Sequence, residues 1–239
     1  TDNGGTVVPE YYRNCALIRA TSTSASRAIM QTRQYHPYIS GTSNRYLMTF
    51  KMDTAKDGLV QYVGAFDDYN GIYFRMNGLV PEVGVRKGNP ENSVSDSTVE
   101  RSSWNVDRLD GSMNEYNPSG ITADFTKCHI LFIDYQWLGV GRVRVGFVID
   151  GVYHVVHEFK HANNTVETYM RQPSLPLRYE IINNDTVSGE LMAICCAAYS
   201  EGADVEVGYN RSVSTDGNPA LTVSNSTDGQ LLLAIRLKN

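Results

Sequence analysis

The sequence predicts an all-β protein, a two-layer antiparallel β-sandwich or jelly roll with little helix. About a dozen short runs of alternating or β-branched residues follow one another, separated by Gly, Asn and Asp. A helical period is nearly absent. Of the 239 residues, 41% are apolar and 20% are charged, which supplies enough apolar surface for a sizeable core.

The N-terminal half contains several predicted strands and two exceptions. The stretch 26–34 has a pattern that suits a turn or two of helix, and the polar stretch 88–100 is typical of an exposed loop. A tight Asp-Asp-Tyr-Asn turn is expected after residue 66. Strands are predicted at 45–52, 59–66, 71–76 and 81–87.

The clearest segment is an antiparallel meander over 128–159. Strict alternation places Phe132 and Asp134 on one face of the first strand, and Ile133 and Tyr135 on the other. Asp-Gly at 150–151 supplies a two-residue type I′ turn before the last strand. The three strands are expected at 128–137, 142–149 and 152–159, and further strands at 175–182, 190–200, 220–225 and 230–238.

Charge and chain organisation exclude several classes of partner. A net charge of -5 and a pI near 5.5 argue against nucleic acid, whose phosphates need a basic face. No run of about 18 apolar residues occurs, so we expect no membrane insertion. Without an internal repeat or a linker, residues 1–239 are predicted to form a single β-sandwich domain. The first residue is Thr1 rather than Met, which favours an excerpt from a longer chain.

Cysteine and histidine spacing favours neither a metal site nor a cofactor. The four cysteines, at 15, 128, 195 and 196, contain no Cys-x-x-Cys pair, and we expect buried free thiols. His154 and His157 lie three residues apart on a predicted strand, which places them on opposite faces. We therefore predict no metal and no cofactor.

The stretch FIDYQWLG (132–139) resembles the active strand of laminarinase-like and xyloglucan-modifying enzymes, which are concanavalin-like sandwiches. In that family the strand reads Glu-hydrophobic-Asp-hydrophobic-Glu, often followed by an aromatic residue, Leu and Gly. Here Asp134 and the Trp-Leu-Gly ending at 137–139 match, but Phe132 and Gln136 stand at the two glutamate positions. A retaining glycosidase needs two carboxyl groups, so we expect no catalytic residues. The fold is predicted to be of jelly-roll or concanavalin- or laminin-G-like type.

Two turn and loop clusters are candidate ligand sites. Asp67, Asp68 and Asn70 sit in one tight turn, where they would suit a sugar or Ca²⁺, although Asx residues form such turns unaided. Trp104, with Asn105 and Asp107, would suit stacking on a sugar and hydrogen bonding to it. The alternative is a loop pinned to the sandwich by a buried Trp104.

Several phrases together resemble virion structural or fibre-like β-sandwich proteins of marine tailed phages and large DNA viruses. They include QYVGAFDDYNGIYF, SSWNVDRLDG, QWLGVGRVRVGFVIDG and LPLRYEI, and the likeness extends over roughly residues 30 to 237. The resemblance implies a component of a particle surface. We expect partners among other virion proteins and copies of the chain itself, and Arg142 and Arg144 mark a candidate contact face.

The sequence thus favours a non-enzymatic virion structural protein, in a capsid, fibre or decoration, that acts through protein–protein contacts. The alternative is a carbohydrate-binding, lectin-like receptor-binding module whose partner is a host-surface glycan. A glycoside hydrolase is a minor alternative, because the required carboxylates are missing.

Overall fold

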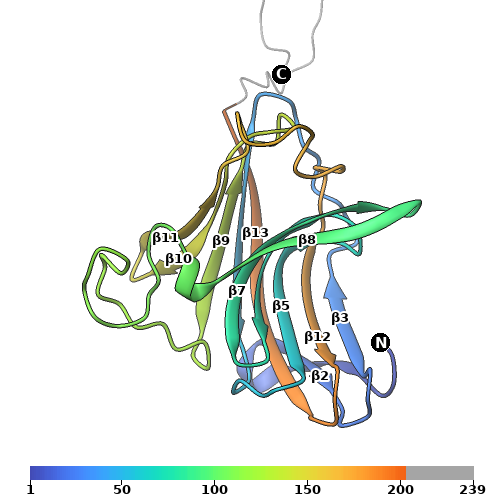
Figure 1. Ribbon diagram of the computed structural model, residues 1–239. Helices are drawn as coiled ribbons and strands as arrows, with labels where there is room; N and C mark the ends of the chain where they lie inside the picture. Colours follow the sequence, from blue (N-terminus) through green and yellow to red (C-terminus); the bar gives the residue numbers. More distant parts are fainter. Residues whose placement is uncertain (203–239) are drawn as a thin grey trace, which may run out of the picture. The chain divides into compact units, whose positions relative to one another are not determined.

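Two antiparallel sheets pack face to face in the computed structural model, which describes residues 1–202 (Figure 1). This confirms the predicted all-β sandwich. The described residues belong to one compact unit, Thr1–Ala203. The strands predicted at 220–225 and 230–238 lie outside the described residues, as does the single-domain prediction for everything after residue 202. Among residues 1–202, none of the helical segments could span a lipid bilayer.

All neighbouring strands in both sheets run antiparallel. The seven-stranded sheet contains, in spatial order, β1 (Thr6–Glu10), β2 (Cys15–Ala20), β13 (Gly189–Glu201), β4 (Ser43–Lys51), β9 (His129–Tyr135), β10 (Val143–Ile149) and β11 (Val152–Phe159). The six-stranded sheet contains β3 (Arg27–Gln31), β12 (Leu177–Asn183), β5 (Leu59–Phe66), β6 (Gly71–Asn77), β7 (Val80–Asn89) and β8 (Asn92–Glu100). Single 3-10 turns, η1 (Tyr11–Arg13) and η2 (Arg101–Ser103), follow β1 and β8.

The core forms between the inner faces of the two sheets. Along β4 the buried residues alternate with partly exposed ones, as a strand with one covered face requires. Aromatic rings cross from sheet to sheet: Phe74 of β6 lies 5.8 Å from Phe50 of β4 and 5.2 Å from Phe147 of β10, measured between ring centroids. These pairs bury large apolar side chains in edge-to-face or tilted geometry, which stabilises the sandwich.

Two predictions for the N-terminal half were wrong. Residues 26–34 contain strand β3, not a helix, because Ala28 points into the core while Arg27 pairs with Glu180 on the outer face. Residues 88–100 are not a loop: β8 pairs with β7 from Glu82–Glu100 to Asn89–Asn92. Strands β1 and β2 had no counterpart among the sequence predictions.

The meander over β9, β10 and β11 is confirmed. Asp150 and Gly151 have φ values of 51° and 80°, as a type I′ turn requires. A register shift in β11 departs from strict alternation. His154 pairs with Phe147, and His157 with Val145, so both histidines lie on the inward face. The expectation of opposite faces failed because a bulge adds one residue between them.

The prediction of buried cysteines was mostly wrong. All four thiols are free, but Cys128, Cys195 and Cys196 are exposed. In β13 the buried alternation ends at Ala193, where the register against β4 shifts. Beyond that shift the strand no longer faces the core.

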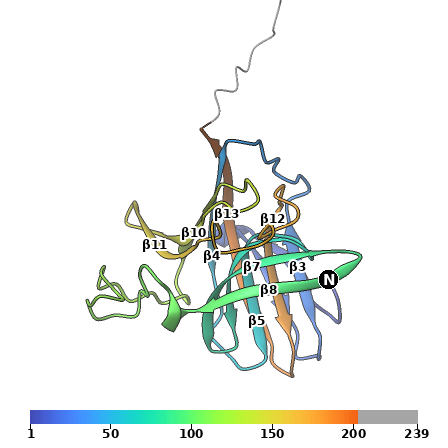
Figure 2. The ribbon, with the colours of Figure 1, turned by 45° about the horizontal axis from the view of Figure 1, so that its top comes forward.

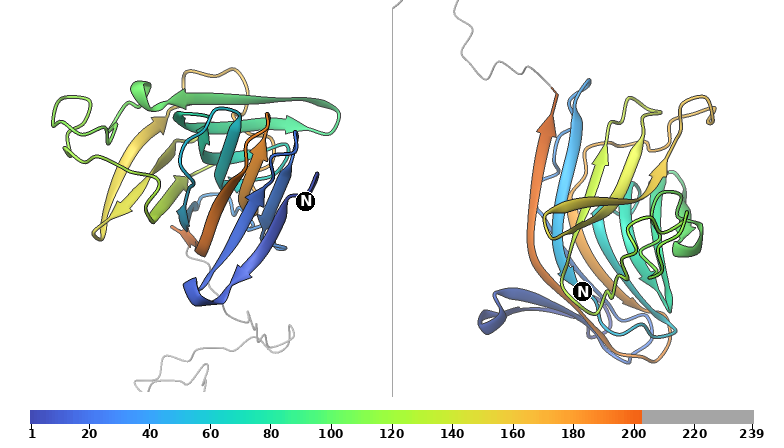
Figure 3. Two further views of the ribbon diagram at one scale, coloured as in Figure 1. Left: turned by 90° about the horizontal axis from the view of Figure 1, so that it is seen from below. Right: turned by 90° about the vertical axis from the view of Figure 1, so that its left-hand side faces the viewer.

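The β7–β8 hairpin is the feature that positions the candidate site. In Figures 1 and 2 it runs in front of β5 and β12, and it extends well past the other strands of its sheet. Figure 3 shows the two layers from two further directions, with the β1–β2 hairpin extending beyond them. The outer half of the hairpin contacts other parts of the chain, through the bond from Asn70 to Gly88 and the ion pair between Lys87 and Glu167.

Candidate functional site

The Asp67–Asn70 turn, predicted as a ligand site, is held by internal bonds. One Asp67 carboxylate oxygen accepts hydrogen bonds from the backbone N–H groups of Tyr69 (2.8 Å) and Asn70 (2.7 Å), the geometry of an Asx turn. Asp68 binds the guanidinium groups of Arg27 (3.1 Å) and Arg178 (2.7 Å). Across residues 1–202, no group of three or more His, Cys, Asp or Glu is arranged to hold a metal ion.

Asn70 connects two parts of the chain that are distant in sequence. Its side-chain amide N–H donates to the Gly88 carbonyl in the β7–β8 hairpin (3.0 Å). Its side-chain oxygen accepts from the backbone N–H groups of Arg171 (2.9 Å) and Gln172 (3.3 Å). Only 4% of Asn70 is exposed. Asn70 therefore fixes the hairpin against the segment that precedes β12.

A groove of about 650 Å³ lies between the β7–β8 hairpin and the irregular segment 161–171. Most of its lining side chains carry a hydroxyl, an amide or a charge. The lining residues are Val85, Lys87, Ser93, Ser95, Ser97, His161, Asn164, Thr165, Val166, Glu167, Thr168, Tyr169 and Arg171.

The hairpin wall of the groove continues the inner face of the six-stranded sheet. Val83 and Val85 of β7 are buried, and alternation places Lys87 on the same face. Across the hairpin, Ser97 pairs with Val85 and Ser95 pairs with Lys87. The same face therefore changes from apolar to polar where the hairpin leaves the core.

The opposite wall, segment 161–171, is anchored by the loop after β9. The Trp137 indole N–H donates to the Met170 carbonyl (2.9 Å), and the Tyr169 N–H donates to the Gly139 carbonyl (3.0 Å). The rings of His161 and Tyr169 stack, with centroids 4.0 Å apart and planes 9° from parallel. Two rings, held in place by backbone bonds, thus line the polar groove.

Ionisation of the groove side chains follows from burial and pairing. Burial lowers the pKa of His161, so the ring is neutral at pH 7 and its Nδ1–H donates to the Gly141 carbonyl (2.8 Å). A hydrogen bond from Lys87 lowers the pKa of the Glu167 carboxyl. Glu167 is the one carboxylate among the lining residues; it binds Lys87 (2.7 Å) and, less closely, Arg171 (3.8 Å).

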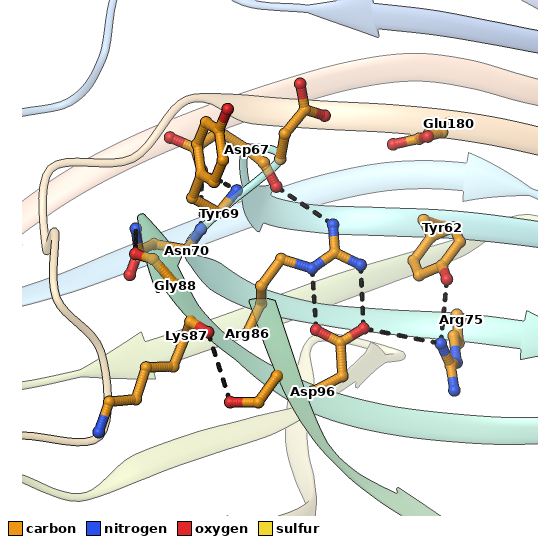
Figure 4. A network of polar contacts seen from close by, with 12 residues as sticks. Tyr62, Asp67, Tyr69, Asn70, Arg75, Arg86, Lys87, Gly88, Asp96 and Glu180 are labelled. Carbon is orange, nitrogen blue, oxygen red and sulfur yellow. Dashed lines mark hydrogen bonds and ion pairs between the residues drawn. The ribbon is translucent and has the colours of Figure 1, made fainter. Parts of the chain in front are cut away.

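The opposite face of the same hairpin holds a closed ionic network (Figure 4). Arg86 forms two bonds to the Asp96 carboxylate (2.9 and 3.0 Å), and Arg75 binds Glu82 (2.5 Å) and the Tyr62 hydroxyl (3.0 Å). Burial opposes ionisation of Asp96, but its bonds to Arg86 outweigh burial and lower the pKa of the carboxyl. These charges are already paired with one another.

The predicted cluster around Trp104 is built into the sandwich. Trp104 is 2% exposed, and its indole N–H donates to the Val99 carbonyl (3.2 Å). Asn105 exchanges two hydrogen bonds of 2.9 Å with the backbone of Glu158. Asp107 is buried and accepts from the backbone N–H groups of Leu109 (3.1 Å) and Ser119 (3.3 Å).

The structure does not bring the two predicted clusters together. The Asp67–Asn70 turn adjoins the groove, whereas residues 104–107 pack against β11. In this conformation Trp104 offers no ring surface to a ligand, as the alternative of a pinned loop requires.

The strand that resembles an enzyme strand carries a single carboxylate. Phe132 and Asp134 face outward on β9, and Asp134 pairs with both Arg45 (3.3 Å) and Arg144. Arg142, the other residue of the predicted contact face, pairs with Glu158 (3.3 Å). Both predicted contact arginines thus bind carboxylates of their own sheet.

Sequence reasoning missed the groove residues of β8. The available signal was the alternation of Ser93, Ser95, Ser97 and Val99, which places these four residues on one face of a strand. Val99 packs against the core, so this face is the inner one. The polar composition of 88–100 concealed it. Segment 161–171 has no periodic pattern, so only the fold reveals that it faces β8.

Comparison with known proteins yields similarity of fold alone. No family model matches the chain, and no curated protein matches it. A legume lectin-like domain from Entamoeba histolytica matches with a TM-score of 0.43 and 11% identity, covering 82% of this chain and 87% of that one. The metal-free carbohydrate recognition domain of Emp46p matches with a TM-score of 0.47 and 10% identity, covering 82% and 86%. An alginate lyase from Klebsiella pneumoniae matches with a TM-score of 0.46 and 10% identity, covering 84% of this chain and 86% of that one.

Proposed function

We propose that this chain is a non-enzymatic carbohydrate-binding module and that the groove between the β7–β8 hairpin and segment 161–171 is its glycan site. The observation that carries the proposal is the lining of that groove. Hydroxyl and amide side chains converge there from two walls, beside the stacked rings of His161 and Tyr169.

The size and chemistry of the groove suit a short saccharide. A volume of about 650 Å³ falls in the usual range for small-molecule sites, roughly 300–1,000 Å³. Serine, threonine and asparagine side chains both donate and accept hydrogen bonds, which matches the dense hydroxyl groups of a sugar. Because Asn70 and Trp137 hold the two walls by backbone bonds, the site is formed before a ligand arrives.

The same lining supports binding without hydrolysis. Glycoside hydrolases use two carboxyl groups that flank the scissile bond, and Glu167 is alone in the groove. Its pKa is lowered by Lys87, whereas a general acid needs a raised one. Asp134 faces outward on the other sheet, paired with Arg45 and Arg144.

A glycan array followed by titration calorimetry tests the proposal. We expect the 239-residue chain to bind at least one class of glycan. Ser97→Trp fills the groove, and it should lower the affinity by about tenfold or more because the ligand loses its contact surface.

The matched control is Thr98→Trp, which adds the same side chain to the neighbouring residue on the other face of β8. It should leave the affinity within about twofold of wild type. Equal losses of affinity in both variants would show that the glycan site is not in this groove. Absence of binding across the whole array would overturn the proposed function.

The sequence resemblance adds a prediction about where such a module acts. A virion location, with other virion proteins or further copies of the chain as partners, is compatible with glycan binding at an exposed groove. Peptide mass spectrometry on purified particles from the source is the test. Detection in particles would support a particle component, and complete absence would contradict it.

A further inference from the structure

Two cations from opposite walls of the groove converge on one carboxylate. Lys87 projects from β7, and Arg171 belongs to the 161–171 segment. Both bind Glu167, Lys87 through one carboxylate oxygen at 2.7 Å and Arg171 through the other at 3.8 Å. The chain's own carboxylate therefore bridges the groove between the two cationic side chains.

This bridge is easily opened. The Glu167 side chain is 61% exposed, whereas the Lys87 side chain is 17% exposed. Val166, the neighbour of Glu167, is fully exposed. Because the carboxylate is on the exposed side of this pair, water and salt screen its contact with Lys87 and other anions can reach the same place. Glu167 can thus leave the groove while Lys87 stays.

Without Glu167, the groove has a positive charge of two. The other two titratable rings of the lining add no charge: His161 is neutral at pH 7 and donates its Nδ1–H to a backbone carbonyl, and burial raises the pKa of the Tyr169 hydroxyl. Two cations that line a polar groove attract an anion, and charge-assisted hydrogen bonds to a carboxylate or sulfate are the strong ones.

We propose that the groove selects acidic saccharides, and that the carboxylate or sulfate of the ligand replaces Glu167 between Lys87 and Arg171. Glu167 then acts as an internal competitor that weakens acidic ligands and leaves neutral ones unaffected. This inference rests on the proposed function, since it names the ligand class of the same groove.

The test compares Glu167→Gln with wild type on one array that carries neutral, carboxylated and sulfated glycans. Removing the competing charge should raise affinity for the acidic glycans about fivefold and leave neutral glycans within about twofold. Lys87→Met should lower affinity for acidic glycans about tenfold or more, since it removes the better buried cation. Carboxylated and sulfated members of the array show which anion fits.

Glu190→Gln is the matched control. Glu190 pairs with Arg19 at the same distance of 2.7 Å, outside the groove, so this variant has the same net charge as Glu167→Gln. If both variants gained the same affinity for acidic glycans, the change in net charge alone would explain the effect, and the inference would be overturned. Binding of neutral glycans alone, blocked by Ser97→Trp, would overturn the inference while the proposed function stands. No binding of any glycan would overturn both.

Discussion

The loop at 104–111 and the segment at 161–171 have similar compositions and different roles. Each contains an aromatic ring, an asparagine, an acidic residue and an arginine. In the loop, the ring is buried and the Asn and Asp side chains bind backbone groups. In the segment, Asn164, Glu167 and Arg171 line an open groove.

The composition of a loop therefore does not identify a binding site. The side chains of Asn105 and Asp107 form hydrogen bonds with the backbone of neighbouring segments, so few of their polar atoms remain for a ligand. The groove is arranged differently, because backbone bonds through Trp137 and Asn70 hold the segment. Asn164 and Thr165 each donate one hydrogen bond to a backbone carbonyl of the chain, but their side chains still line the open groove. Four changes in stability or glycan affinity distinguish the 104–111 loop, which supports the fold, from the groove, which binds a ligand.

The largest expected effect is on stability, at Trp104. Trp104→Ala should lower the free energy of unfolding by about 3–5 kcal/mol because it empties a site in the core. Urea denaturation measures this loss. Tyr116→Ala, at a half-exposed ring in the same region, should cost less than about 1 kcal/mol. A Trp104→Ala chain that keeps its stability but loses glycan binding would make the loop the binding site instead.

The second-largest expected effect is acid sensitivity at His157 of β11, which supports the 104–111 loop. His157 is buried and accepts the Asn105 backbone N–H at Nδ1 (3.3 Å), and burial lowers its pKa to about 4. In the unfolded chain the pKa of His157 is about 6.5. Between pH 6.5 and pH 4, the unfolded chain therefore binds a proton at His157 that the folded chain does not bind. Stability should therefore fall by about 2–3 kcal/mol as the pH drops from 6.5 to 4.

Urea denaturation at several pH values measures this slope. His157→Gln removes the titrating group, and the stability of this variant should change less over the same range. An unchanged slope in His157→Gln would assign the acid sensitivity to other groups.

The third prediction addresses Asn70, which joins the two walls of the groove. Asn70→Ala removes three hydrogen bonds to backbone groups and should cost about 2 kcal/mol. Amide hydrogen exchange at Arg171 and Gln172 should become faster, and glycan affinity should fall. Tyr69→Ala, at the exposed neighbour in the same turn, is the control. Unchanged exchange at both amides would contradict the role given to Asn70.

Local patterns predicted the strands that are rich in apolar and β-branched residues. The bounds of β5 and β11 match the predicted ranges 59–66 and 152–159, because apolar and β-branched residues mark such strands. The strand β8 was missed since Ser, Asp and Asn are poor strand formers. It forms because β7 offers a complete partner and Val99 packs against the core.

The groove itself could not be predicted from the sequence. It needs three parts that are far apart in the chain: the turn at Asn70, the hairpin at 87–97 and the segment 161–171. Asn70 was selected as a ligand residue, but its amide binds the backbone of both walls. Spacing along the chain cannot distinguish these roles, because the partners of Asn70 are 18 and 101 residues away.

The smallest expected effect on stability is at Ser95, in the hairpin wall of the groove. Its exposed hydroxyl makes one long hydrogen bond, to the Lys87 carbonyl (3.4 Å), so Ser95→Ala should change the free energy of unfolding by less than about 0.5 kcal/mol. The same variant should lower glycan affinity about threefold to tenfold, since a sugar hydroxyl loses a partner. Calorimetric titration beside urea denaturation measures both quantities. A loss of affinity without a loss of stability is what distinguishes a residue that binds from one, such as Trp104, that supports the fold.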